Sequence, residues 1–270
     1  MRLLPLGSML ALLPLLATPV AAQVAGGKSE PRAWSGDIAV GAGVRPDYVG
    51  SDDLEATPYI AGRINYGAFY LDFQGQQVRL NLSPFEGVAF GPMIDVENKR
   101  DDDVKSLRVA KLPKLDDALE AGGFIAYSRR GVLSEQDQLT FMGSYMVDTS
   151  DTFDGAVGGM SVIYGRRLNS RWSIGGSAKI DIVDRKYARA YFGVTPSQAA
   201  LSGLAAYDLK GGVRDIALST KVAYALTERW NLQLLGNYKR LTGDFADSPL
   251  VKGEGSADQF SAAIAVGYRF

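Results

Sequence analysis

The amino-acid sequence predicts an all-β protein: a transmembrane antiparallel β-barrel of about twelve strands, with its N- and C-termini on the periplasmic side. Three observations predict this fold. First, residues 260–270 are apolar at every second position and finish on the aromatic side chains Tyr268 and Phe270, so a strand here has one lipid-compatible face. Second, segments with the same period of two recur along the chain. Third, short and long connections alternate between these segments, as in outer-membrane barrels.

The N-terminal region predicts export. Residues 1–22 carry one positive charge, an apolar run broken by two prolines, and a small-residue cleavage site ending at Ala22, which together indicate a signal peptide. A membrane-spanning helix is the alternative, but the interrupted run barely reaches the roughly 20 residues that such a helix needs. Residues 23–33 form a polar linker, and residues 34–270 form the barrel domain. We therefore expect a Gram-negative outer-membrane location.

The composition excludes several classes of function. Lys and Arg number 29 against 30 Asp and Glu, so nothing in the charge favours nucleic acid as a partner. The chain has no histidine and no cysteine, which excludes Ser-His and cysteine catalysis and removes the commonest transition-metal ligands. The sequence thus predicts a protein that is not an enzyme and has no cofactor and no metal. A Ser–Lys pair among Ser173, Ser177 and Lys179, or a carboxylate pair, stays open, although a polar lumen lining is the preferred interpretation.

The first five strands are expected within residues 34–96, after the linker. Residues 34–44 place Ile38, Val40, Ala42 and Val44 on one face, and a weaker strand at 55–64 turns at Asn65-Tyr66-Gly67. Strands at 68–73 and 77–83 have apolar faces made of Phe69, Leu71 and Phe73, then Val78, Leu80 and Leu82. Residues 87–96 form the fifth strand. No convincing amphipathic helix is expected in these segments or in those that follow.

The remaining strands follow a charged loop at residues 98–117. Alternation resumes at 118–130, 138–147 and 156–166, and it is clearest at 171–183. In that segment Trp172, Ile174, Ala178, Ile180 and Ile182 face one way, whereas Ser173, Ser177, Lys179 and Asp181 face the other. Strands at 213–224, 230–241 and 260–270 complete the set, separated by loops at 184–210 and 242–256.

The lengths of the connections predict the orientation. Short connections lie around Asn65 and Pro84 and at residues 131–137, 169–170 and 227–228. The other set is long, at residues 45–53, 98–117, 148–155, 184–210 and 242–256, with only the connection at Gly75 short. Short turns are typical of the periplasmic side and long loops of the outside.

Charged side chains should face the lumen, because an Arg or Lys on the lipid side near the midplane costs about 2–4 kcal/mol. The candidate lumen-lining residues are Lys179, Asp181, Lys221 and Lys239, whereas Arg240 is off parity near a strand end. Trp34, Trp172 and Trp230 lie near predicted strand starts. Anchoring at the membrane interface explains these tryptophans better than stacking on a sugar.

Four motifs carry a resemblance to a known family. The chain contains Pro46-Asp47-Tyr48-Val49-Gly50-Ser51, then Tyr191-Phe192-Gly193-Val194 with Ala200-Leu201-Ser202-Gly203-Leu204, then Gly243-Asp244-Phe245-Ala246-Asp247-Ser248-Pro249, and a final Gly267-Tyr268-Arg269-Phe270. In this order they resemble the MipA/OmpV family of outer-membrane proteins. The resemblance implies an outer-membrane barrel, and the name-giving member is described as a scaffold that joins a lytic transglycosylase to a penicillin-binding synthase in murein (peptidoglycan) synthesis. Other members are linked to osmotic response, adhesion or permeation.

Three functions follow as hypotheses. The first is the murein-enzyme scaffold, acting through the periplasmic turns and the linker. The second is a narrow pore for small solutes, whose ion preference the four lumen charges would set. The third is adhesion through the outer loops. The motif residues in these loops are expected to fold into the barrel mouth rather than to recognise a ligand. Tyr268 and Phe270 are the expected signal for the barrel-assembly machinery, which together with outer-membrane lipid is an expected partner.

Overall fold

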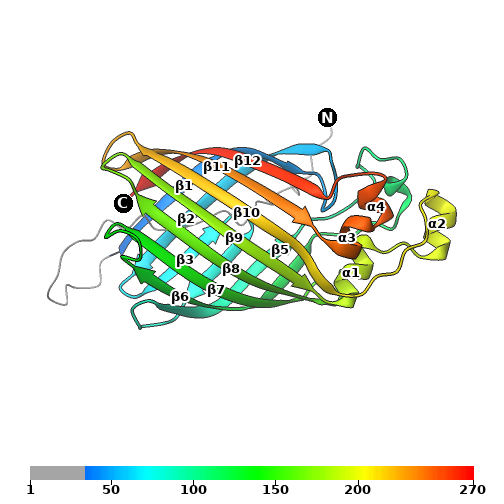
Figure 1. Cartoon of the computed structure of the whole chain (residues 1–270), viewed down its shortest axis with the longest axis horizontal. Helices are drawn as coiled ribbons and strands as arrows, with labels where there is room; N and C mark the ends of the chain where they lie inside the picture. The colour runs from blue at the N-terminus through cyan, green and yellow to red at the C-terminus, as the bar shows by residue number, and fades with distance from the viewer. Residues whose placement is uncertain (1–33) are drawn as a thin grey trace, which may run out of the picture.

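The computed structural model describes residues 34–270 and shows a closed barrel of twelve antiparallel strands (Figure 1). Each strand pairs with its neighbours in the sequence, and β12 pairs with β1 to close the cylinder. Closure lets the backbone groups pair within the sheet, as a hydrocarbon environment requires. The predicted signal peptide and linker lie outside the described residues.

The strands confirm the predicted antiparallel β-barrel and its number of strands. Each observed boundary lies within two residues of the predicted one. Their bounds are β1 (Trp34–Pro46), β2 (Leu54–Tyr66), β3 (Phe69–Gln74), β4 (Gln77–Asn81), β5 (Val88–Glu97), β6 (Ala118–Arg130), β7 (Asp137–Asp148), β8 (Ala156–Arg167), β9 (Trp172–Val183), β10 (Gly212–Ala225), β11 (Trp230–Leu241) and β12 (Asp258–Arg269).

The seam between β1 and β12 shows how the two faces are separated. On β12 the outward-facing Ile264 is 54% exposed, whereas its inward-facing neighbours Ala263 and Ala265 are buried. Backbone hydrogen bonds between Gly36 and Phe270, at 3.1 and 3.0 Å, extend the seam to the last residue. The seam between β1 and β12 is therefore hydrogen-bonded as far as the short-turn end of the barrel.

We expect deletion of Phe270 to destabilise the barrel, whereas Phe270→Ala should be milder. The deletion removes two backbone hydrogen bonds, each worth about 0.5–1.5 kcal/mol, but alanine retains both. The measurement is urea unfolding in lipid vesicles, followed by tryptophan fluorescence, with Phe85→Ala in an exposed turn as the control. Equal effects of deletion and alanine substitution would show that the ring, not the seam, supplies the stability.

An aromatic belt surrounds part of the short-turn end. Three tryptophans each contact a tyrosine on the neighbouring strand: Trp34 with Tyr66, Trp172 with Tyr224, and Trp230 with Tyr268, at ring-centroid distances of 4.9, 4.7 and 4.8 Å. All three tryptophans are exposed. Amphipathic rings at one level of the barrel are the arrangement expected at a membrane–water interface.

The opposite end of the barrel carries short helices, which the sequence analysis did not expect (Figure 1). They are the 3₁₀-helix η1 (Val109–Lys111) and the α-helices α1 (Arg185–Phe192), α2 (Pro196–Ser202), α3 (Gly243–Asp247) and α4 (Pro249–Lys252). The expectation was wrong because helices of three to eight residues show too few turns for a helical period. No helix within residues 34–270 is long and apolar enough to cross a membrane.

The long loops pack together as a folded lid, which we define as residues 98–117, 184–211 and 242–257. One apolar cluster joins Tyr191 and Phe192 of α1 to Phe245 of α3. A second joins the loop around Val109 to Val194 and to Leu250 of α4. Because three loops share these two buried clusters, the lid has a core of its own and covers one mouth of the barrel.

Candidate functional site

A polar cavity of about 130 Å³ lies in the lumen beneath the lid; we call it the chamber. Inward side chains of β5, β6, β9, β10, β11 and β12 line it, so it extends across the width of the barrel. Its lining also includes Pro46, Tyr48 and Gln76 at the loop-end rim. The chamber therefore extends from the inner wall of the barrel to its loop-end rim.

Arg214 is the centre of the chamber's ionic network. Its Nε donates to Asp215 at 2.6 Å, Nη1 to Glu97 at 2.9 Å, and Nη2 to Asp181 at 3.2 Å. Arg214 is only 4% exposed, and Asp181 and Asp215 are buried with it. The planar guanidinium presents donors in several directions, so one cation serves three carboxylates.

A β-bulge turns Arg214 toward the lumen. The pairing of β10 with β9 shifts between Val213 and Asp215, which leaves Arg214 as the extra residue. Strict alternation would put Arg214 on the face opposite to Asp215, yet both side chains are buried. Bulges re-aim side chains in this way. Strand periodicity therefore does not place Arg214 in the lumen.

Tyr187 of α1 ties the lid to this network. Its hydroxyl donates to Glu97 at 2.7 Å and also contacts Arg214, whose guanidinium carbon lies 5.1 Å from the centre of the tyrosine ring. Burial raises the pKa of Tyr187 well above its usual value, so the hydroxyl stays protonated and able to donate at neutral pH. The contact holds α1 over the mouth.

The structure brings three of the four candidate lumen residues to the chamber. Lys179 forms an ion pair with Asp181 at 2.9 Å, and Lys239 lines the chamber two strands away, on β11. Within residues 34–270, Lys239 has no ion pair within 4.0 Å. Lys221 faces the lumen nearer the short-turn end, where Asp37 and Asp72 are the charged groups acting on it.

A second ionic cluster lies in that lower part of the lumen. Asp72 is almost fully buried and bonds to Arg63 at 2.5 Å and to Arg79 at 2.9 Å. Between the two clusters the lumen contains packed side chains, including buried Tyr59 and Leu235. The sequence analysis did not single out Arg63, Asp72 or Arg79, although the period of two in their strands places all three on the inner face.

The motif in the β1–β2 connection shapes the rim. Pro46 ends β1, Tyr48 is buried in the lid's second apolar cluster, and Gly50 adopts a φ of +99°, which favours glycine. The backbone N–H of Gly50 donates to Gln259 of β12 at 3.0 Å, and its carbonyl accepts from Ser256 at 2.9 Å. These contacts join the first loop to the last.

The two later motifs hold the helices of the lid. Ser202 ends α2 and its hydroxyl donates to the carbonyl of Gln198 at 2.7 Å, while Gly203 closes that helix with a φ of +76°. Gly243 begins α3, and the carbonyl of Asp244 accepts from Tyr207 at 2.8 Å.

The junction between α3 and α4 contacts α1. The buried hydroxyl of Ser248 donates to the carbonyl of Phe192 at 2.7 Å, and Pro249 begins α4. Asp247 pairs with Lys252 at 3.0 Å on the exposed side. The family-motif residues therefore join the segments of the lid and the rim to one another.

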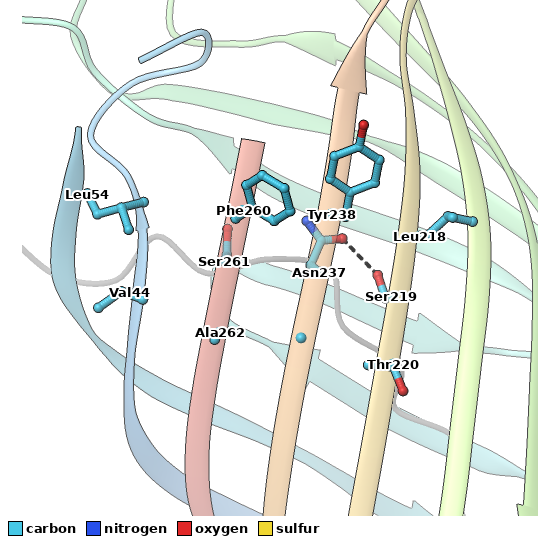
Figure 2. A pocket seen from close by; sticks show the side chains of 11 residues that line it. Val44, Leu54, Leu218, Ser219, Thr220, Asn237, Tyr238, Phe260, Ser261 and Ala262 are labelled. Atoms are coloured by element: carbon cyan, nitrogen blue, oxygen red, sulfur yellow. Dashed lines mark hydrogen bonds between the residues drawn. The ribbon is translucent and has the colours of Figure 1, made fainter. Parts of the chain in front are cut away.

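A larger hollow of about 430 Å³ opens on the outer face of the barrel (Figure 2). It forms because Thr220, Gly236 and Ala262 are neighbours in the register of β10, β11 and β12 and leave a row of small residues. The surrounding walls include Leu218 and Phe260. This surface has no ionisable side chain except Tyr238, so it suits hydrocarbon and offers no reactive group.

Comparison with known proteins assigns the family. The family described as MltA-interacting protein MipA matches residues 38–270, which is nearly the whole described chain. The chain belongs to the MipA family. This match confirms the resemblance found in the loop motifs, and it covers the barrel together with the lid.

Named relatives of this MipA-family chain are outer-membrane proteins. Omp26La of Vibrio anguillarum is 32% identical over 93 residues, which cover 34% of each chain. The putative outer-membrane protein YiaT of Escherichia coli K12 is 27% identical over 132 residues, which cover 48% of this chain and 51% of YiaT. The matches thus span a third to a half of these relatives. Together with the closed barrel they support an outer-membrane location.

Two solved structures show a weak likeness to this chain. OmpT of Vibrio cholerae aligns with a TM-score of 0.38 and 9% identity. The alignment covers 90% of this chain and 99% of the OmpT chain. The toluene transporter TodX of Pseudomonas putida aligns with a TM-score of 0.37 and 9% identity. The alignment covers 89% of this chain and 90% of the TodX chain. At these scores the likeness carries no argument about function.

Proposed function

We propose that this outer-membrane barrel is not an enzyme and acts as a scaffold, binding murein-synthesis enzymes at its short-turn end. The short turns and both termini then face the periplasm, where a lytic transglycosylase and a penicillin-binding synthase act on murein. The name of the family refers to interaction with MltA, which supports a partner of this class. The loop end with its lid faces outward.

The observation that carries the proposal is a row of arginines without ion pairs at the short-turn end. It comprises Arg129, Arg130, Arg166, Arg167, Arg171, Arg229 and Arg269, which we call the arginine arc. Among the described residues none of them has an ion pair within 4.0 Å, and Arg166, Arg171 and Arg229 interact with tyrosine hydroxyls, those of Tyr164, Tyr224 and Tyr268. The arc runs from β6 to β12 and places seven arginines along this edge, against the exposed Glu135 and Glu228 of the intervening turns. Such a surface favours an acidic partner.

The filled lumen supports binding over free diffusion. The lid covers one mouth, Arg214 and its carboxylates occupy the space below it, and Tyr59 and Leu235 pack further down. A barrel of this size can be filled by side chains and loops. The surfaces left for interaction are then the two ends and the lipid face.

Capture of a purified lytic transglycosylase by the refolded barrel tests the scaffold. Replacing Arg129, Arg166, Arg171 and Arg229 by serine should weaken capture by about tenfold or more, because each lost cation at a contact reduces electrostatic attraction. The control variant carries serine in place of four exposed loop-end lysines, Lys111, Lys114, Lys186 and Lys210. It loses the same net charge as the arginine variant and should capture the transglycosylase as the wild type does. Equal capture by both variants, or none by the wild type, contradicts the proposal.

A narrow pore is the second candidate, and one observation favours it. The β3–β4 connection at Gly75 and Gln76 is the only short one at the loop end of the described barrel, and Gln76 lines the chamber. The connection joins the two shortest strands, β3 and β4, so the barrel wall is low at this point of the rim. Stepwise conductance of the protein in a planar bilayer, altered by Lys179→Glu, would support the pore and count against the filled lumen.

A further inference from the structure

We propose that the chamber binds a small primary ammonium compound between the carboxylates of Asp95 and Glu120. This inference is independent of the scaffold role, since it concerns the interior of the barrel and not its short-turn end. It depends on the pairing of these two carboxylates, on the absence of a cation bonded to them, and on the cavity that they line.

Asp95 and Glu120 are direct neighbours across β5 and β6. They are register partners and both line the chamber, so their Cβ atoms lie about 4.5–5.5 Å apart on one face. Two like charges in this position destabilise a sheet unless something compensates them. The pair therefore requires a proton or a cation.

Glu120 is the strongest sign of a missing partner. It is 4% exposed, yet its Oε1 has no hydrogen-bond partner in the part of the chain that the structure describes. Asp95 accepts from the side-chain amide of Gln77 at 2.7 Å and from the backbone N–H of Val96 at 2.9 Å, both neutral donors. A buried carboxylate without a donor is costly, so an incoming donor gains binding energy here.

The neighbouring cations are bonded elsewhere. Arg214 bonds to Glu97, Asp181 and Asp215, and Lys179 bonds to Asp181. Lys239 is on β11, five strands from β6 around the barrel, and so projects from the far wall. Within residues 34–270 neither Asp95 nor Glu120 has an ion pair within 4.0 Å.

The geometry favours an ammonium ion over a metal ion. Calcium needs six to eight oxygen ligands, and no group of three or more acidic side chains among the described residues is arranged to hold a metal. A primary ammonium needs only three acceptors, which the two carboxylates can supply. Met146 and Val157, which also line the chamber, offer contact to a short alkyl chain.

The volume limits the size of the ligand. The cavity of about 130 Å³ exceeds the roughly 10–15 Å³ that a cavity needs to hold one water, so it can admit a small organic cation. Propylammonium, with four non-hydrogen atoms, is such a cation. Pro46 and Gln76 line the cavity at the loop-end rim, where the short β3–β4 connection makes the barrel wall low.

Calorimetric titration of the refolded protein in detergent micelles with propylammonium chloride tests the proposal. Saturable binding is expected for propylammonium but not for tetramethylammonium, which has the same charge and no N–H donor. Glu120→Gln and Asp95→Asn should each weaken binding by about tenfold or more, because each loses a charge-assisted hydrogen bond. Glu86→Gln, in an exposed short-end turn, is the matched control and should bind as the wild type does.

Three results would overturn the assignment. They are no saturable binding by the wild type, equal binding by Glu120→Gln, and tighter binding of calcium than of propylammonium. Both carboxamide variants are first checked for heat-modifiable migration in SDS gels, so that a loss of binding is not a loss of folding. Capture of the lytic transglycosylase by Glu120→Gln should be unchanged, which separates failure of this site from failure of the scaffold.

Discussion

Arg214→Ala is expected to lower the free energy of unfolding by about 3–5 kcal/mol, the usual cost of removing one partner from a buried ion pair. Arg214 compensates Glu97, Asp181 and Asp215, and its removal leaves Asp215 without the cation to which it bonds. The variant also loses the contact with Tyr187 that holds α1 over the chamber. Urea unfolding in lipid vesicles, followed by tryptophan fluorescence, measures the change.

Arg214→Lys should recover only part of this loss. A lysine ammonium is a point charge on a flexible chain and cannot reach three carboxylates as a planar fork does. Arg189→Ala is the matched control, because Arg189 also pairs with a carboxylate, that of Asp208, but at an exposed surface where such pairs contribute little. If the Arg214 and Arg189 variants unfold alike, the buried network does not stabilise the barrel.

The strands were predictable because each has one lipid-facing side. Ile264 and Val266 alternate with Ala263 and Ala265, and a slip by one residue would put the small residues into the lipid. This requirement repeats over segments of about ten residues. It therefore identifies the long strands reliably from periodicity alone, and it also placed Lys179 and Asp181 of β9 on the inner face.

The lid was less predictable because its helices are held by contacts distant in sequence. α1 has eight residues, and its buried side chains pack against Phe153 and Phe245. One local signal was available: Thr195 and Gln198 form a capping box, followed by Pro196 at the first helical position of α2. That signal predicts the start of a helix, but not that the helix belongs to a lid.

The chamber could be predicted only in part. Lys179, Asp181 and Lys239 follow the inward period of their strands, and the structure brings these three together. Arg214 does not follow its period, because the bulge beside Asp215 inserts an extra residue. A bulge of this kind leaves no mark in the alternation of a single sequence, so the centre of the network was hidden.

Ile264→Arg is expected to destabilise the barrel by about 2–4 kcal/mol, the cost of an arginine on the lipid face near the bilayer midplane. Ile264 points outward from the middle of β12, between Leu234 of β11 and Ala42 of β1. No acidic side chain is among these register neighbours. Urea unfolding of the protein folded into lipid vesicles measures the change.

A depth series makes this result specific to the membrane. Thr227→Arg, in the exposed β10–β11 turn, should cost almost nothing, and Val266→Arg, nearer the short-turn end than Ile264, should cost less than Ile264→Arg. In a barrel that stays in water the three substitutions should differ little, since each side chain would be solvated. A cost that peaks at Ile264 and falls toward the turn would therefore locate the hydrocarbon band on β12. A flat profile would contradict the lipid-facing assignment on which the barrel's orientation and the scaffold proposal depend.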